Sequence, residues 1–283
     1  VTFGDANTDS STFTGGVSFS ANAASNLGGA IVTSGDVADF GTGGVTLGSD
    51  STVDTTNAGG SAAGANIIFG AGIAGAFDLG LTAGTGGAVT VATTTNITDL
   101  TLTSATSNTF TGNVTVNDLI TTANSGTITL NGAANTFVAA VDFLNTGLVT
   151  LGDAGTDSST FAGGVAFTGT AASALQGAFV TTNTNANFGA GGVTLGANTT
   201  ITTGAATAGD IAFGAGITDG AGGFDLGLTA GTGAVTVATT TNITDLTLTQ
   251  AASNTFTGNV TVNDLITTAN SGTITLNGAV NTF

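Results

Sequence analysis

The chain has 283 residues, uses only eleven residue types and carries a formal charge of −17, because it contains 17 acidic residues and no lysine or arginine. Histidine, cysteine, glutamate and tyrosine are also absent, so no side chain offers a general base near neutral pH, a thiolate or a cationic clamp for an oxyanion, and we expect no enzyme. The missing cations exclude nucleic acid as a partner and disfavour anionic membranes, whereas small cations, Ca²⁺ above all, are the natural counter-charge.

The first part of the chain is repeated in its second half. Residues 1–19 return in closely similar form as residues 149–167. The segment from Asn108 to Ala133 returns letter for letter as Asn254 to Ala279. An identical copy of this length indicates a tandem repeat.

These matches divide the chain into repeat 1, residues 1–148, and repeat 2, residues 149–283. Repeat 2 is incomplete and continuous with repeat 1, because Phe283 corresponds to Phe137. We therefore expect either a window from a longer array or a subunit whose open ends meet the next subunit.

Phenylalanines mark a smaller period inside each repeat. The interval from Phe13 to Phe40 recurs unchanged in repeat 2, between the phenylalanines at positions 161 and 188. A period of this size is typical of solenoids, in which each coil buries its apolar face on its neighbours. The spacing predicts coils of this one length, with three strands each and with stacked phenylalanines inside. The wider gap between Phe69 and Phe110 predicts one additional coil.

The residue types favour strands over helices. Valine, isoleucine, threonine and phenylalanine dominate, and they alternate with period two in runs such as residues 89–91, 100–102 and 274–276. Turns are supplied by pairs such as Asn-Gly, Gly-Gly and Ser-Gly. We therefore predict an all-β fold, a parallel β-helix (β-solenoid) built from tandem repeats.

The apolar stretches of the chain do not predict a membrane span. Residues 64–81 form the most apolar stretch, but they are rich in glycine and contain Asp78. The counterpart, residues 209–228, contains three aspartates, so we predict no membrane insertion.

The candidate metal ligands lie near the start of each repeat. Asp5, Asn7 and Asp9 have the spacing that opens a calcium-binding loop, and Asp153 and Asp157 are their counterparts in repeat 2. The motif fails further on, where a glycine and a bidentate glutamate are expected. The alternative is that these residues form turns by bonding their own backbone. Ca²⁺ is the only cofactor that the sequence suggests.

Threonine and asparagine recur in regular positions. Threonine runs such as Thr101/Thr103 and Thr127/Thr129 favour a flat threonine ladder, a feature of ice-binding faces, but threonine is also the ordinary residue on an exposed strand face. Asparagines recur in turns, and amides stacked coil over coil would form hydrogen-bond ladders.

Several motifs carry a family resemblance. NTFTGNVTVNDLI, TFTGGVSF and GTITLNGA resemble the rungs of bacterial β-strand-repeat proteins, the large secreted adhesins of the filamentous-haemagglutinin and autotransporter passenger type. The resemblance covers essentially the whole chain and implies a right-handed parallel β-helix, export to the cell surface, and a structural or adhesive role. Lysine, tyrosine and tryptophan, which the family normally contains, are missing here.

The sequence thus predicts a structural subunit or repeat segment of a secreted extracellular filament, sheath or surface layer that assembles end to end through its coil edges. The main partner is then another copy of the chain, with cell-surface glycans or other matrix proteins as further partners. The alternative is a stalk or passenger of a large cell-surface adhesin. Ice binding and functional amyloid, in which identical chains stack in register, are the lesser alternatives.

Overall fold

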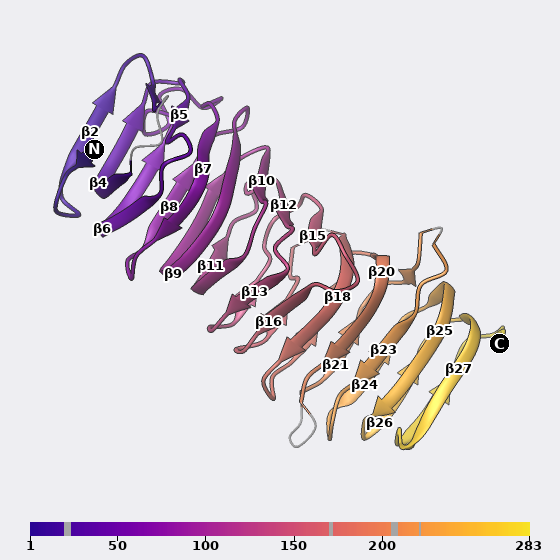
Figure 1. Ribbon diagram of the computed structural model, residues 1–283. Coiled ribbons are helices and arrows are strands. Elements are labelled where there is room, and N and C mark those ends of the chain that lie inside the picture. The colour runs from indigo at the N-terminus through magenta and orange to yellow at the C-terminus, as the bar shows by residue number, and fades with distance from the viewer. Residues whose placement is uncertain (20–23, 170–171, 205–208, 221) are drawn as a thin grey trace. The chain divides into compact units, whose positions relative to one another are not determined.

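The chain consists of short parallel strands in the computed structural model (Figure 1). The structure describes residues 1–19, 24–169, 172–204, 209–220 and 222–283. Within these ranges there are no helices, and hence no helix that is long and apolar enough to cross a membrane.

The strands belong to two compact units. Unit 1 contains Val1–Phe137 and Asn145–Gly147, and unit 2 contains Val138–Leu144 and Leu148–Phe283. The strands of unit 1 are β1 (Thr2–Phe3), β2 (Ser10–Phe13), β3 (Val17–Ser18), β4 (Ser25–Thr33), β5 (Ala38–Asp39), β6 (Val45–Asp54), β7 (Ile67–Ala74), β8 (Leu79–Thr82), β9 (Ala88–Ser104), β10 (Ser107–Phe110), β11 (Val114–Thr121), β12 (Thr127–Leu130) and β13 (Ala134–Phe137).

Unit 2 follows a similar order, except that the counterparts of β7 and β9 are each divided into two strands. Its strands are β14 (Val141–Asp142), β15 (Val149–Leu151), β16 (Ser158–Phe161), β17 (Val165–Ala166), β18 (Ser173–Thr181), β19 (Ala186–Asn187), β20 (Val193–Thr202), β21 (Ile211–Phe213), β22 (Ile217–Thr218), β23 (Leu226–Thr229), β24 (Ala234–Val237), β25 (Thr240–Gln250), β26 (Ser253–Phe256), β27 (Val260–Asn270) and β28 (Thr273–Leu276).

Three parallel stacks of strands build unit 1. Stack 1 joins β1, β4, β6, β7, β9, β11 and β13. Stack 2 joins β2, β4, β6, β8, β9 and β11, and stack 3 joins β3, β5, β7, β9, β10 and β12. Long strands such as β9 turn a corner and so belong to more than one stack, with a shift of register at the corner.

Unit 2 has the same three stacks. Stack 1 joins β15, β18, β20, β22, β25 and β27, and stack 2 joins β16, β18, β20, β23, β25 and β27. Stack 3 joins β14, β17, β19, β21, β24, β26 and β28. The predicted all-β solenoid is therefore confirmed, and its strands pair successive coils of one chain.

The prediction of coils of one constant length is wrong. Val17 pairs with Ala38, and Ala38 pairs with Ile67, so the second of these two coils is the longer. Asn108 pairs with Ile128, across a coil that is shorter than either. The length of a coil thus varies with its loops, because loops accept insertions without disturbing the strands.

The phenylalanines that define the repeated interval lie in different stacks, so the interval is not the length of one coil. Phe13 ends a strand of stack 2 and pairs with Thr33, whereas Phe40 follows β5 in stack 3. The predicted additional coil between Phe69 and Phe110 is confirmed, because Val91 pairs with both of these phenylalanines.

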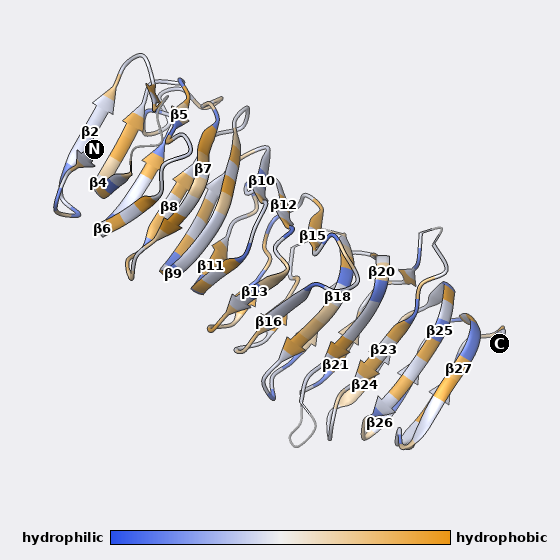
Figure 2. Ribbon diagram, viewed as in Figure 1, coloured by the Kyte–Doolittle hydropathy of each residue, from blue (hydrophilic) through white to orange (hydrophobic). Residues whose placement is uncertain are grey.

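Apolar and polar residues alternate along the strands, as the hydropathy colouring shows (Figure 2). In β12, Ile128 and Leu130 are fully buried, while Thr127 and Thr129, which alternate with them, are only half-buried. The predicted phenylalanine stacks are confirmed: the rings of Phe40 and Phe69 are 4.5 Å apart and nearly parallel, at 2°. This core leaves the outer faces, the turns and the coil edges as the surfaces that carry function.

Candidate functional site

The residues of the predicted calcium loop in repeat 1 form a turn. The Asp9 carboxylate accepts hydrogen bonds from the backbone N–H groups of Asp5, at 2.9 Å, and Ala6, at 3.3 Å. In return, the Asp9 N–H donates to the Ala6 carbonyl at 3.1 Å. The backbone donors at Asp5 and Ala6 lower the pKa of Asp9, because they stabilise its charged form. Asn7 lies exposed in the same turn.

Repeat 2 builds the same turn with a more buried carboxylate. Asp157 is only 6% exposed and accepts hydrogen bonds from the N–H groups of Asp153, at 2.8 Å, and Ala154, at 2.9 Å. Across the part of the chain that the structure describes, no three histidine, cysteine, aspartate or glutamate side chains are grouped so that they could hold a metal ion. These hydrogen bonds are those of turn-forming residues, and calcium binding stays a prediction.

A row of four aspartates crosses successive coils of unit 1. Asp50 accepts the backbone N–H of Asp78 at 3.2 Å, and Asp99 pairs in register with Asp118. Desolvation raises the pKa of Asp78, and the charges of Asp99 and Asp50 raise it further. Desolvation, followed by the charge of Asp99, also raises the pKa of Asp118. The row therefore holds like charges close together, and the chain has no cationic side chain to offset them.

Unit 2 contains the equivalent row with one charge removed. Asn198 replaces the first aspartate, and its amide donates to the Asp225 carboxylate at 3.2 Å and accepts the Asp225 N–H at 3.1 Å. The row continues through Asp245, whose N–H donates to Asp225 at 3.3 Å, and Asp264, which pairs with Asp245. The Asn198 amide donates a hydrogen bond to the neighbouring carboxylate, whereas an aspartate at this position would repel it.

Neither row was predicted from the sequence. A signal was present, because an aspartate directly precedes a core leucine at Asp78, Asp99 and Asp118. The intervals between these residues differ with the loops, so their alignment follows only from the strand register.

Each unit has a groove beside its aspartate row. The groove has a volume of about 620 Å³ in unit 1 and about 540 Å³ in unit 2. Gly80 lies between Thr52 and Thr101 in the column that lines the unit 1 groove, and Ile120 follows Thr101. Gly227 takes the same position in unit 2. A glycine inside a strand leaves a gap on the surface, because it has no side chain.

The predicted threonine ladder is short and interrupted. The groove column is broken by Gly80 and ends in an isoleucine. In stack 3, Thr90, Thr109 and Thr129 lie in register over three coils, but Ile68 precedes them in the same column.

The turn asparagines join coils through the backbone. The Asn108 amide donates to the Ser125 carbonyl at 2.5 Å, and the Asn135 side-chain oxygen accepts the Val114 N–H at 3.0 Å. The predicted stacking of amide on amide is thus replaced at these positions by bonds from an amide to the backbone of a neighbouring coil.

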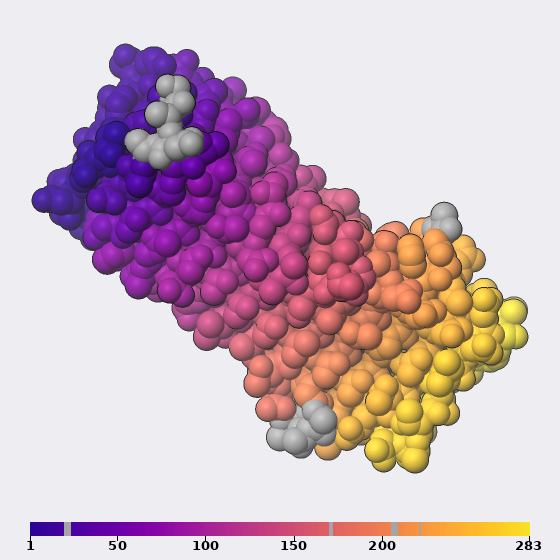
Figure 3. Space-filling view, in the orientation of Figure 1, coloured from indigo at the N-terminus to yellow at the C-terminus, as the bar shows by residue number. Residues whose placement is uncertain are grey.

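The two copies of the identical segment differ in exposure. Ile128 and Leu130 are 0% exposed in the first copy, whereas their counterparts Ile274 and Leu276 are only half-buried. The same contrast separates Leu119, which is 1% exposed, from its counterpart Leu265, which is half-buried. The last coil, coloured yellow, lies at the surface (Figure 3). The strands β27 and β28 therefore present an open edge with apolar side chains.

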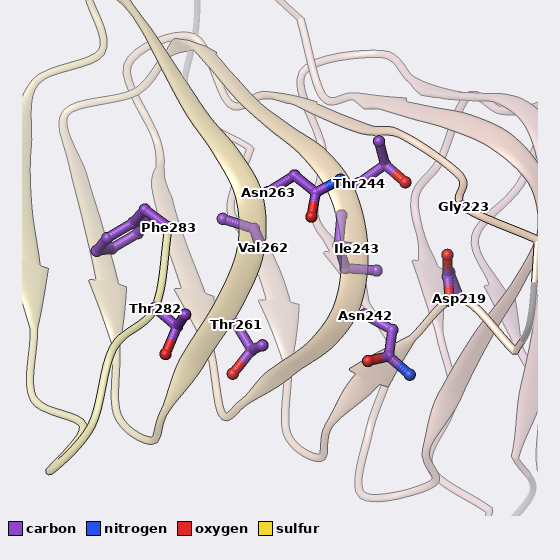
Figure 4. Close-up of a pocket in the computed structure, with 10 residues that line it drawn as sticks. All are labelled: Asp219, Gly223, Asn242, Ile243, Thr244, Thr261, Val262, Asn263, Thr282 and Phe283. Atoms are coloured by element: carbon purple, nitrogen blue, oxygen red, sulfur yellow. The ribbon is translucent and has the colours of Figure 1, made fainter.

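A hollow of about 650 Å³ adjoins this edge in unit 2 (Figure 4). Ile243, Val262 and Phe283 follow one another along its wall, and Thr261 is bridged to Thr282 in parallel register. Phe283 is 55% exposed, whereas its counterpart in repeat 1, at position 137, is fully buried. The apolar side chains of the last coil are thus more exposed than their counterparts in repeat 1.

No family model, no curated protein and no solved structure matches this chain.

Proposed function

We propose that this protein is a structural subunit or repeat segment of an extracellular filament, sheath or surface layer, and that it assembles end to end through the edges of its solenoid. The observation that carries the proposal is the exposure of apolar residues in the second copy of a segment whose first copy is buried. An open edge of a parallel solenoid also presents unpaired backbone groups, which act as a template for another strand.

The first coils of unit 1, near Val1, also support the proposal. Val1 is 56% exposed and Phe13 is half-buried, whereas their counterparts in repeat 2, Val149 and Phe161, are 0% exposed. Each edge coil thus repeats a sequence that is buried elsewhere in the chain.

Association through these edges has a clear driving force. Complete burial of a leucine or isoleucine side chain stabilises by about 1.5–3 kcal/mol. Leu265, Ile274 and Leu276 are already half-buried, so covering each of them contributes roughly half of that amount. Strand pairing adds backbone hydrogen bonds, and the loss of freedom on association opposes both terms.

Sedimentation velocity and electron microscopy over a range of protein concentrations test the proposal. We expect the mass to rise with concentration and filaments to appear. The variant Leu276→Lys places a charge in the apolar edge and should abolish assembly. The matched control Thr275→Lys adds the same charge to the adjacent residue, which faces water, and should assemble normally. A wild-type protein that stays monomeric at all concentrations would contradict the proposal.

The grooves favour a second candidate function, that of an adhesive stalk. Both units have a groove of similar volume at equivalent positions, and threonine with aspartate or asparagine supplies the polar part of its lining. Such side chains offer hydrogen bonds to a neutral polyhydroxyl ligand such as a surface glycan. Binding of glycans by the monomeric Leu276→Lys variant would favour this function over assembly.

A further inference from the structure

We infer that Asn96 in unit 1 and Asn242 in unit 2 are acceptor sites at which the folded chain takes N-linked sugars from a diphosphate-activated donor. In this reaction the side-chain amide nitrogen forms a bond to the anomeric carbon of the sugar and loses one proton, while the diphosphate carrier leaves. The inference concerns the outer face of each unit and does not depend on assembly through the coil edges.

The chain contains several copies of the sequence that transferases recognise for N-linked sugars. This sequence is Asn-x-Thr, in which the middle residue is not proline. Every asparagine in such a sequence is exposed, so exposure alone does not distinguish the sites. The five asparagines are Asn96, Asn113, Asn198, Asn242 and Asn259.

Two of these side chains are fixed to a neighbouring coil through their oxygen. The Asn113 side-chain oxygen accepts the Ala134 N–H at 3.0 Å, and the Asn259 oxygen accepts the Val280 N–H at 3.2 Å. Such a bond holds the amide along the coils. It has to break before the amide nitrogen can swing out into the active site of a transferase.

The third side chain is held by two bonds. Asn198 accepts the Asp225 N–H at 3.1 Å, and its amide nitrogen donates to the Asp225 carboxylate at 3.2 Å. The nitrogen that would carry the sugar is therefore already in use. Hydrogen bonding thus removes three of the five sites.

Asn96 and Asn242 are the two that remain. Neither side chain forms a hydrogen bond to any residue that the structure describes. Both residues have the left-handed backbone conformation that asparagine tolerates, with φ angles of 57° and 60°. The two sites therefore share one conformation in the two units.

A bulge at a corner of the solenoid turns Asn96 outward. The register of β9 and β11 pairs Thr94 with Val114 and Ile97 with Val116, so two residues of β9 lie opposite one residue of β11. Both of these residues, Thr95 and Asn96, are exposed, although neighbours in a regular strand point to opposite faces. The bulge thus presents the free amide to solvent.

Unit 2 builds the same bulge. Thr240 pairs with Val260 and Ile243 pairs with Val262, and the two intervening residues are again exposed. The second of them is Asn242, whose side chain is drawn in Figure 4.

The exposure of Asn96 does not come from an uncovered coil. In the coil before it, Ile73 pairs with Thr94, and in the coil after it, Val116 pairs with Ile97. The bulge therefore has a paired strand on each side, and the Asn96 amide still faces water.

Two peptides and the folded protein test the inference together. The peptides are VATTTNITDLT, residues 91–101, and NTFTGNVTVND, residues 108–118, which contain Asn96 and Asn113. The enzyme is a soluble transferase that attaches glucose from UDP-glucose to the asparagine of both peptides. Because both sequences are accepted as peptides, any difference between the same asparagines in the folded protein is due to the fold.

Mass spectrometry can follow all five sites in one digest. The chain has no lysine or arginine, but a protease that cleaves before aspartate places each asparagine in a fragment of its own. These fragments are residues 78–98, 99–117, 157–209, 225–244 and 245–263. We expect the modified fraction at Asn96 and Asn242 to be about tenfold higher than at the other three, because those three have to give up a hydrogen bond.

Variants of one threonine supply the controls. Thr98→Ala removes the recognised sequence and should abolish modification at Asn96 while leaving Asn242 unchanged, whereas Thr98→Ser keeps the sequence and should restore it. Equal modification of all five asparagines in the folded protein overturns the inference. So does a folded protein that stays unmodified at Asn96 and Asn242 while the peptides are modified.

Discussion

Asp50 and Asn198 occupy the same position in the two repeats, and they differ in what they offer the next coil. Asp50 accepts one backbone N–H of Asp78 and places a second negative charge beside that carboxylate. Asn198 accepts the corresponding N–H and also donates to the carboxylate of Asp225. One exchange of oxygen for nitrogen thus turns repulsion into a hydrogen bond.

We predict that Asp50→Asn stabilises unit 1 at pH 7 and that Asn198→Asp destabilises unit 2. The effect should be roughly 0.2–1 kcal/mol in each case, the range of exposed charge interactions. The folded state raises the pKa of Asp78, so this residue favours folding below its ordinary pKa, and the contribution is lost as the pH rises through the raised value. The melting temperatures of the two variants, measured at pH 3 and pH 7, should diverge from wild type only at the higher pH. Equal shifts at both pH values would show that charge is not the cause.

The buried turn carboxylate gives a prediction about metal removal. Asp157→Ala leaves the N–H groups of Asp153 and Ala154 without their acceptor, and it should cost about 1–3 kcal/mol. If Asp157 acts only as a turn acceptor, this loss is the same with calcium and with a chelator. Calorimetry in both conditions decides the matter. Calcium that stabilises the wild type but not the variant would identify a metal site instead.

Strands and their inward faces could be predicted from the sequence, because alternation with period two is a local property. Val89 and Val91 are buried, and so are Leu100 and Leu102, as their alternation with threonine indicates. The length of the coils could not be predicted, because it depends on which stack each strand joins. The aspartate rows were missed for the same reason: alignment across coils depends on loop lengths that have no periodic signal.

The corner turns offer a test of how one glycine shapes a coil. Gly126 has a φ of 66°, and a Cβ there would lie 2.2 Å from the Ala105 carbonyl oxygen. Gly126→Ala should therefore destabilise by roughly 1–3 kcal/mol through strain and displaced backbone. Gly15→Ala is the control, because a Cβ on Gly15 meets nothing within 4 Å, and its effect should be below about 0.5 kcal/mol. Thermal unfolding of both variants gives the comparison, and equal melting temperatures would show that the corner conformation is not required.

Both units repeat one design, in which the strands of each coil pair with those of the coils before and after it. Stability of a solenoid is then close to a sum over coils and their interfaces, so an uncovered edge coil lacks the stabilisation of one interface. The proposed assembly supplies that interface. Its opposing force is electrostatic, because every copy carries 17 aspartates and no lysine, arginine or histidine.

Assembly should therefore strengthen with ionic strength. Two chains that each carry a formal charge of −17 repel one another, and salt shortens the range of this repulsion from about 30 Å at 0.01 M to about 8 Å at 0.15 M. Such screening does not weaken contacts between apolar side chains, so light scattering should show faster assembly as sodium chloride is added. Assembly should also become faster as the pH falls toward the isoelectric point of about 4.1, because the net charge of each copy then decreases. Calcium chloride at matched ionic strength separates screening from specific binding. Dissociation by added salt would contradict apolar burial as the force that holds the copies together, because the chain has no cationic side chain to form complementary charge pairs.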